Sequence, residues 1–329
     1  MSELHKFIFD GLPVRGIIVR LTDAWTEILS RRASNEATGA YPPEVCELLG
    51  EMSAAAVLMQ AGIRFNGTLV LQIFGEGPVR VAVAEVQHDL SLRATAKVVG
   101  DLPPGARLGE MVNVNNKGRC AITLDPKDKF PGQQPYQGTV PLYDDQRRPI
   151  ARLSEVLEHY MLQSEQLDTT LVLAADGKVA AGLLIQRLPV QGEGNLAGSL
   201  VSRANEDEIG VNEDYKRIAL LARTLARDEL LSLDVDTILR RLFWEEKVLR
   251  FEPQAGDTAP RFACTCSRER VRNMIRSLGV DEADSIIAER GDIEVGCDFC
   301  GRQYRFDPVD AAQIFTEPGK QPPSTSAVQ

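Results

Sequence analysis

The sequence predicts an α+β fold: a β-rich N-terminal core domain with packed helices, then a helical linker and a small cysteine-containing domain. Three observations lead to this prediction. Strand and helix patterns come in blocks over the first 190 residues, without the regular alternation of a βαβ protein. Apolar residues then recur at helical spacing, and four of the six cysteines fall in the last 66 residues. We expect the core domain at 1–191, the linker at 192–256, the cysteine-containing domain at 257–315 and a disordered tail at 316–329.

The composition is typical of a folded globular protein. Of the 329 residues, 43% are apolar, and 37 Lys and Arg against 47 Asp and Glu give a net charge of −10. This negative charge disfavours bulk binding to nucleic acid or to an anionic membrane. No stretch reaches the ~18 apolar residues of a membrane helix, and the N-terminus lacks the apolar segment of a secretion signal. We therefore expect a cytoplasmic protein with no nucleic-acid partner and no membrane partner.

The elements of the core domain follow from the spacing of its apolar residues. Alternating or continuous apolar runs predict strands joined by tight turns, and apolar intervals of three and four predict helices. The longest helical pattern begins at Pro42 and Pro43 and runs to Met59, and it is apolar enough to be buried. Other helices are expected around Trp25 and at 153–164, and strands at 15–21, 69–73, 79–83, 94–99, 121–124, 139–142, 170–174 and 180–188.

The linker carries two amphipathic helical stripes. Ile218, Leu221 and Leu225 form the first, and the apolar residues of 235–243 form the second, with Asp234 as its N-cap. The segment contributes no predicted sheet of its own. We therefore expect its apolar faces to rest on the core domain.

The cysteines of the last part carry the strongest chemical signal. They occur as Cys264-Thr-Cys266, then thirty residues, then Cys297-Asp-Phe-Cys300. Two closely spaced pairs supply four soft thiolates, which suit a tetrahedral Zn²⁺ ion. The sequence therefore predicts one zinc per chain in the reduced protein, bound by all four cysteines.

The residues between and after the cysteine pairs predict a small fold. Two short helices fit the gap, and a terminal hairpin fits the residues after Cys300. The first helix would be capped by Ser267 and end at Gly279, the second would be capped by Asp281 and end at Gly291, and Tyr304 and Phe306 would lie in the hairpin.

Two roles are open for such a site on the residues alone. A closed structural zinc site is the ordinary one. Two cysteines one residue apart can close only a strained disulfide, and strained disulfides are labile and regulatory. Arg268, Arg270 and Arg272 would favour reactive thiolates, but they could equally solvate a helix face. On these residues the structural role is favoured.

The remaining candidates predict no catalytic or cofactor-binding residue, and hence no enzyme. Cys46 and Cys120 each lie alone in an apolar stretch, which is typical of buried core cysteines. His5, His88 and His159 have no neighbours at metal-ligand or triad spacing.

The cysteine block resembles the zinc-binding end of the redox-regulated heat-shock chaperones, the 33 kDa chaperonins. The resemblance rests on the run from Cys264 to Arg270 and on Cys297-Asp-Phe-Cys300-Gly301. Gly75-Glu-Gly-Pro78, Ser164-Glu-Gln-Leu167 and Phe243-Trp-Glu-Glu246 also resemble that family, so the likeness covers nearly the whole chain. The sequence departs from the family at 125–138 and beyond Phe315.

The resemblance implies a bacterial, ATP-independent holdase that is inactive when reduced and zinc-bound. Peroxide or hypochlorite, with mild unfolding, would form the disulfides Cys264–Cys266 and Cys297–Cys300, release zinc and expose a surface for unfolded client proteins during oxidative stress. The family also suggests a homodimer on activation.

Two other functions remain as alternatives. One is a zinc-ribbon module that binds nucleic acid, which the net charge of −10 disfavours. The other is a thiol-disulfide oxidoreductase. That enzyme would need a C-x-x-C motif opening a helix of a thioredoxin-like unit, whereas Cys297 and Cys300 are expected in a turn before a hairpin.

Overall fold

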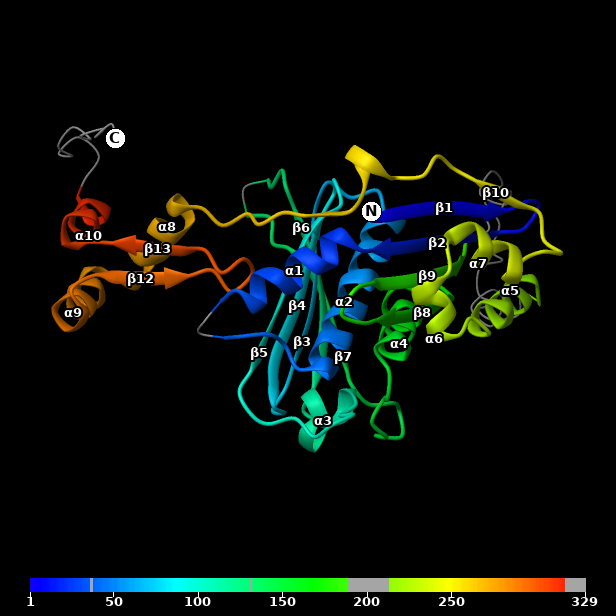
Figure 1. Cartoon of the computed structure of the whole chain (residues 1–329), viewed down its shortest axis with the longest axis horizontal. Helices are drawn as coiled ribbons and strands as arrows, with labels where there is room; N and C mark the ends of the chain where they lie inside the picture. Colours follow the sequence, from blue (N-terminus) through cyan, green and yellow to red (C-terminus); the bar gives the residue numbers. More distant parts are fainter. Residues whose placement is uncertain (36–37, 131, 189–212, 317–329) are drawn as a thin grey trace, which may run out of the picture. The chain divides into compact units, whose positions relative to one another are not determined.

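The computed structural model describes residues 1–35, 38–130, 132–188 and 213–316 (Figure 1). The chain divides into two compact units, Met1–Ala263 and Cys264–Gln329. The first contains two sheets and most of the helices, and the second contains a hairpin and three helices. The predicted α+β class is confirmed. Every helix within the described ranges is too short or too polar to span a bilayer.

The first sheet is fully antiparallel, with strand order β10-β1-β2-β9-β8. Its central strands β2 and β9 are buried along almost their whole length, because both faces of this sheet are covered. Its strands are β1 (Glu3–Phe9), β2 (Val14–Leu21), β8 (Thr169–Ala175), β9 (Ala180–Arg187) and β10 (Val248–Arg250).

The second sheet has the order β11-β5-β4-β3-β6-β7, and only the β11–β5 pair is parallel. Burial alternates along β3, so this sheet turns one face to the core. Its strands are β3 (Gly67–Phe74), β4 (Val79–Gln87), β5 (Ser91–Val98), β6 (Arg119–Pro126), β7 (Tyr136–Pro141) and β11 (Arg261–Phe262).

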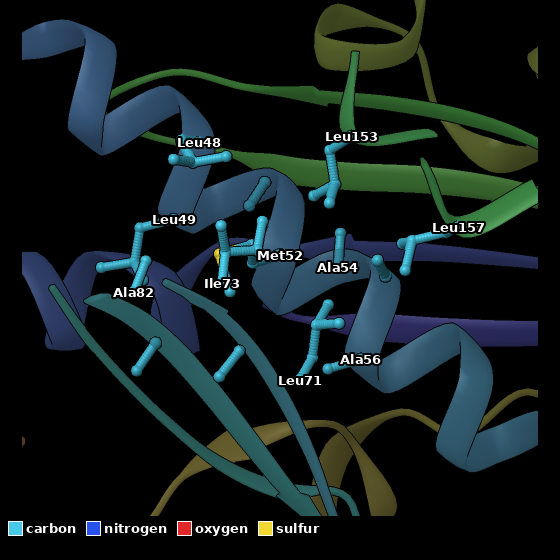
Figure 2. Packing of buried hydrophobic residues seen from close by; sticks show 14 of the residues in the cluster. Leu48, Leu49, Met52, Ala54, Ala56, Leu71, Ile73, Ala82, Leu153 and Leu157 are labelled. Atoms are coloured by element: carbon cyan, nitrogen blue, oxygen red, sulfur yellow. The ribbon is translucent and has the colours of Figure 1, made fainter. Parts of the chain in front are cut away.

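Helix α2 (Pro43–Gly62) packs against strands of both sheets, and 13 of its 20 residues are buried. Figure 2 shows Leu49 and Met52 of this helix above Ile73 and Ala82 of the second sheet. Gly50 allows a close approach to the first sheet, because a Cβ there would lie 2.4 Å from the Cβ of Ala175. The predicted buried helix is thus confirmed. The other helices of this region are α1 (Asp23–Ala33), α3 (Leu108–Val112) and α4 (Leu153–Glu165).

Three later helices cover the opposite face of the first sheet: α5 (Glu213–Arg223), α6 (Arg227–Ser232) and α7 (Val235–Leu242). Both predicted stripes face a second core cluster that includes Phe7, Phe9 and Ile18 of the sheet. The Asp234 carboxylate accepts a hydrogen bond from the Thr237 amide at 2.8 Å, which is the expected N-cap. The predicted linker residues 192–212 lie outside the described ranges, as do residues 317–329 of the predicted tail.

Strand β1 has no counterpart in the sequence prediction, and neither do the two short strands β10 and β11. β10 lies within the expected helical linker, yet it pairs with β1. β11 lies at the expected start of the cysteine-containing domain, yet it pairs with β5 in the first unit. β10 and β11 are each two or three residues long, so their pairing depends on partner strands far away in the sequence.

The second unit is built around one small core. The hairpin β12 (Ile293–Gly296) and β13 (Gln303–Phe306) confirms the predicted one. Ser267 caps α8 as expected, but α9 begins at Val280 after Gly279, so Asp281 lies in its first turn and is not its cap. The helices are α8 (Arg268–Leu278), α9 (Val280–Arg290) and α10 (Pro308–Phe315). The buried core residues are Val271, Ile275, Ala283, Ile293, Tyr304, Phe306, Ala311 and Ile314.

Two arginines fix the ends of α6. The Arg20 guanidinium, on β2, donates hydrogen bonds to the carbonyl oxygens of Leu230, Leu231 and Leu233 at 3.1, 2.7 and 3.0 Å. These carbonyls end the helix and have no partner within it, and a cation is favoured there. At the other end, Arg227 pairs with Glu47 at 3.1 Å. Helix α6 is therefore held in place by directional hydrogen bonds and an ion pair as well as by apolar contacts.

We expect Arg20→Leu to loosen α6 in the reduced protein. Hydrogen bonds to a charged group contribute about 1.5–3 kcal/mol each, so amide exchange at the end of α6 should accelerate roughly tenfold or more. Arg31→Leu, which removes an exposed ion pair with Glu27, is the matched control and should change little. Equal protection of α6 in all three proteins would show that Arg20 does not hold it.

Candidate metal centre

The four cysteines come from two segments of the second unit. Cys264 and Cys266 lie on the segment before α8, and Cys297 and Cys300 lie in the turn between β12 and β13. The structure brings all four together, with every pair of Sγ atoms within 4.8 Å. Two close contacts join the segments: the Sγ atoms are 3.7 Å apart for Cys264 and Cys297, and 3.4 Å apart for Cys266 and Cys300.

These separations fit a metal-ligand set. Zn–S bonds of about 2.3 Å in a tetrahedron place the sulfur atoms about 3.8 Å apart, whereas a disulfide needs about 2.05 Å. None of the six cysteines, all within the described ranges, forms a disulfide. Among the described residues, this is also the only group of three or more side chains close enough to hold a metal ion. The donors are four sulfurs, the set that closed structural zinc sites use.

The turn that carries Cys297 and Cys300 is shaped for a thiolate. The Cys297 amide donates to the Arg302 carbonyl at 2.9 Å, and Gly301 closes the turn with a φ of +71°, which glycine adopts readily. The amides of Phe299 and Cys300 hydrogen-bond to the Cys297 sulfur, and the amide of Arg302 to the Cys300 sulfur. Such N–H donors stabilise the charged form of a thiol.

Tyr304 adds a side-chain donor to this cluster. Its hydroxyl donates a hydrogen bond to Cys266 Sγ at 3.1 Å. Burial raises the pKa of Cys266, but the hydrogen bonds from Tyr304 and the neighbouring thiols outweigh it and lower that pKa to about 7. Burial raises the pKa of Cys297 and of Cys300. Within the cluster, the pKa is thus lowered at Cys266 and raised at Cys297 and Cys300.

Two of the α8 arginines that the sequence singled out contact groups other than the sulfur atoms. Arg268 pairs with Asp310 at 2.6 Å and stacks on the Phe306 ring at 4.2 Å, so it fastens α8 to α10. Arg270 donates to the hydroxyl of Thr265 at 2.7 Å, between the first two cysteines.

Arg302 lies beside the same hairpin, and its hydrogen bond with Tyr304 is the main cause that raises its pKa. Sequence reasoning missed this residue and the role of Tyr304. The available signal is their position, two residues apart directly after the Cys300-Gly301 turn.

The other cysteines and His5 have structural surroundings. Cys120 is fully buried on β6, and burial raises its pKa to about 12. Cys46 is half-buried on α2, and burial raises its pKa to about 11. His5 lies between Glu3 and Arg250, at 2.9 and 2.8 Å. None of these side chains belongs to the metal-ligand group.

A family model described as "Hsp33 protein" matches residues 2–307. The chain belongs to the Hsp33 family. The 33 kDa chaperonin of Chromobacterium violaceum is 44% identical over 318 residues, covering 95% of this chain and 94% of the relative. That of Methylobacillus flagellatus is 41% identical over 316 residues, with 96% and 94% coverage. The resemblance seen in the cysteine block is therefore confirmed.

The fold also matches a solved member of the Hsp33 family. The crystal structure of the 33 kDa chaperonin from Thermotoga maritima aligns with a TM-score of 0.69 and 21% sequence identity, covering 95% of this chain and 97% of that one. In this Hsp33-family chain, Cys297 and Cys300 join two antiparallel strands and do not open a helix. This arrangement differs from that of a thioredoxin-like oxidoreductase.

We expect Tyr304→Phe to weaken metal binding. The variant keeps the ring in the core but removes the hydrogen bond to Cys266, and losing such an outer-shell partner typically costs about 10–100-fold in metal affinity. Chelator competition on the reduced protein measures the change. Tyr215→Phe, whose hydroxyl pairs with Thr170 in the first unit, is the control. An affinity for zinc unchanged by Tyr304→Phe would contradict this role.

Proposed function

We propose that this protein is a redox-regulated molecular chaperone, an ATP-independent holdase that binds unfolding proteins after its four-cysteine centre is oxidised. The observation that carries the proposal is the convergence of two closely spaced cysteine pairs in one small unit of an Hsp33-family chain. Relatives that match nearly the whole chain are named 33 kDa chaperonins. In this proposal 257–315 is the switch and 192–256 the linker that transmits its state.

We propose that Cys264, Cys266, Cys297 and Cys300 hold one Zn²⁺ ion per reduced chain. The support is an all-sulfur donor set, sulfur separations close to a tetrahedron edge, and N–H and O–H donors aimed at the sulfurs. The chemistry supplied by such an ion is a cross-link between the two segments. The second unit has only eight buried core residues, and so small a core supplies little net stability by itself. Structural zinc contributes an apparent ~10–16 kcal/mol in small domains.

Oxidation is proposed to form Cys264–Cys266 and Cys297–Cys300. Each pair of thiols loses two electrons and two protons to one peroxide molecule, which is reduced to two waters. The close contacts Cys264–Cys297 and Cys266–Cys300 lie across the segments, but disulfides formed there would still join the segments. Bonds within each segment use up all four ligands and leave the segments unlinked. The family pairing is thus the one that removes the cross-link.

The proposed partners follow from the function. They are unfolded client proteins and, on activation, a second copy of the chain. The proposal assigns no catalytic residue, no nucleic-acid partner and no membrane partner, and it places the protein in the bacterial cytoplasm.

Peroxide treatment of the reduced, zinc-loaded protein is the direct test. We expect release of one zinc per chain, disulfides Cys264–Cys266 and Cys297–Cys300 in peptide mapping, and the onset of aggregation suppression. Cys297→Ser should retain zinc poorly when reduced. Cys46→Ala with Cys120→Ala should behave like the parent, since neither belongs to the cluster. Full activity without zinc release would overturn the proposal.

Charges placed on the docking face of α5 should mimic activation. Leu225 is only 6% exposed and Leu221 packs against the same core, so Leu221→Glu with Leu225→Glu should free the linker in the reduced, zinc-loaded protein. Leu220→Glu is the matched control, because Leu220 is 67% exposed. We expect aggregation suppression and faster amide exchange in 213–243 only for the double variant. If the double variant showed faster exchange in 213–243 but no aggregation suppression, release of the linker would not be what activates the protein.

A further inference from the structure

One edge of the first sheet is covered by the chain that follows α7. Residues 247–254 run antiparallel to β1 along nearly its whole length. The hydrogen bonds join Asp10 N to Lys247 O at 2.9 Å, Phe251 N to Lys6 O at 3.0 Å, and Leu4 with Gln254 in both directions at 3.0 and 2.9 Å. Ile8 pairs with Leu249 between them. Alternate residues of β1 therefore turn their backbone groups toward this segment.

The covering segment has few apolar anchors, and its side-chain contacts are polar: Lys247 pairs with Asp10, and Arg250 pairs with Asp236 and His5. Leu249 and Phe251 are 40% and 55% exposed, and Val248 is only partly buried. β1, in contrast, carries Leu4, Phe7 and Phe9, which are all buried in the cores. The permanent partner is thus β1, and 247–254 is held by main-chain hydrogen bonds and a few polar side-chain contacts, with little apolar burial.

The same stretch of chain leads directly to the cysteines. After residue 254 it adds β11 to the edge of β5, where the Ala263 amide donates to the Leu92 carbonyl at 3.0 Å. Cys264 is the next residue. Loss of order at Cys264 and Cys266 therefore begins at the end of the segment that covers both sheet edges.

We propose that the β1 edge, once 247–254 leaves it, binds an extended segment of an unfolded client protein by β-strand addition. This rests on the proposed function for the release step. An uncovered edge presents a row of unpaired N–H and C=O groups that can pair with another chain. Backbone groups are common to every unfolded protein, so recognition through them is tolerant of client sequence. The occupant already seen on this edge is itself an extended segment with exposed apolar side chains.

A labelled peptide of residues 246–255 is the first probe. We expect it to bind the oxidised protein and not the reduced one, and to be displaced by reduced, carboxymethylated α-lactalbumin, a permanently unfolded chain. N-methylation at Phe251 removes the N–H that faces β1 and should weaken binding at least tenfold. N-methylation at Arg250 is the matched control, because that residue is out of phase in the ladder and its N–H faces away from β1.

Two variants test the edge in the full-length protein. Ile8→Pro removes an edge N–H without touching the pairing of β1 with β2, and proline is tolerated on edge strands. It should lower aggregation suppression by the oxidised protein, whereas Ile8→Val should not. Leu249→Pro loosens the cover and should let the reduced protein bind the peptide without oxidation.

The outcomes separate this inference from the proposed function. Oxidised protein that suppresses aggregation but binds both N-methylated peptides equally, or binds no peptide, overturns the inference and leaves the function standing. Oxidised protein that does not suppress aggregation overturns the function. In that case reduced Leu249→Pro decides the inference, because peptide binding there supports edge pairing and its absence overturns it.

Discussion

The convergence of four sulfur atoms from two distant segments is the constraint on which, in the proposed function, the order of the second unit depends. Its hairpin and three helices share only eight buried core residues, and several of its arginines are engaged in ion pairs at the surface. A core of this size offsets little of the chain entropy lost on folding. In the proposed function, the folding stability of this unit therefore depends mainly on the four-cysteine cluster, which an oxidant can break. This makes the unit suited to respond to an oxidant as a whole.

In the first unit, the buried core and the segments that cover it are held by different kinds of contact. Helix α2 packs against both sheets and contributes 13 buried residues. The opposite face of the first sheet is covered by α5, α6 and α7, and its β1 edge by 247–254. These late segments are held by apolar faces, by the Arg20 contacts at α6 and by strand pairing. In the proposed switch they leave while the sheets and α2 remain folded as a platform for clients.

Local pattern and chemistry predicted part of this structure from the sequence. Helix α2, the main strands, the hairpin and the convergence of the four cysteines follow from apolar spacing and ligand chemistry, which act within short stretches. β1 was missed, although it pairs with the next strand along the chain. β10, β11 and the contacts of Arg20 were missed because each depends on a partner far away in the sequence. Asp281 was misplaced because Gly279 ends one helix and directly precedes the next. The role of Tyr304 could not be predicted from the sequence, because it depends on the register of the folded hairpin.

Differences in thiol pKa decide which cysteine an oxidant reacts with first. Only the thiolate form attacks peroxide, and a thiol with a pKa of about 12, such as Cys120, is ionised to about one part in 10⁵ at pH 7. Cys46, with a pKa of about 11, is ionised to about one part in 10⁴. Cys266, with a pKa of about 7, is ionised in about half of the molecules when metal-free. In the proposed function, an oxidant therefore reacts at Cys266 of the cluster sooner than at Cys46 or Cys120, which lie in the platform that clients would need.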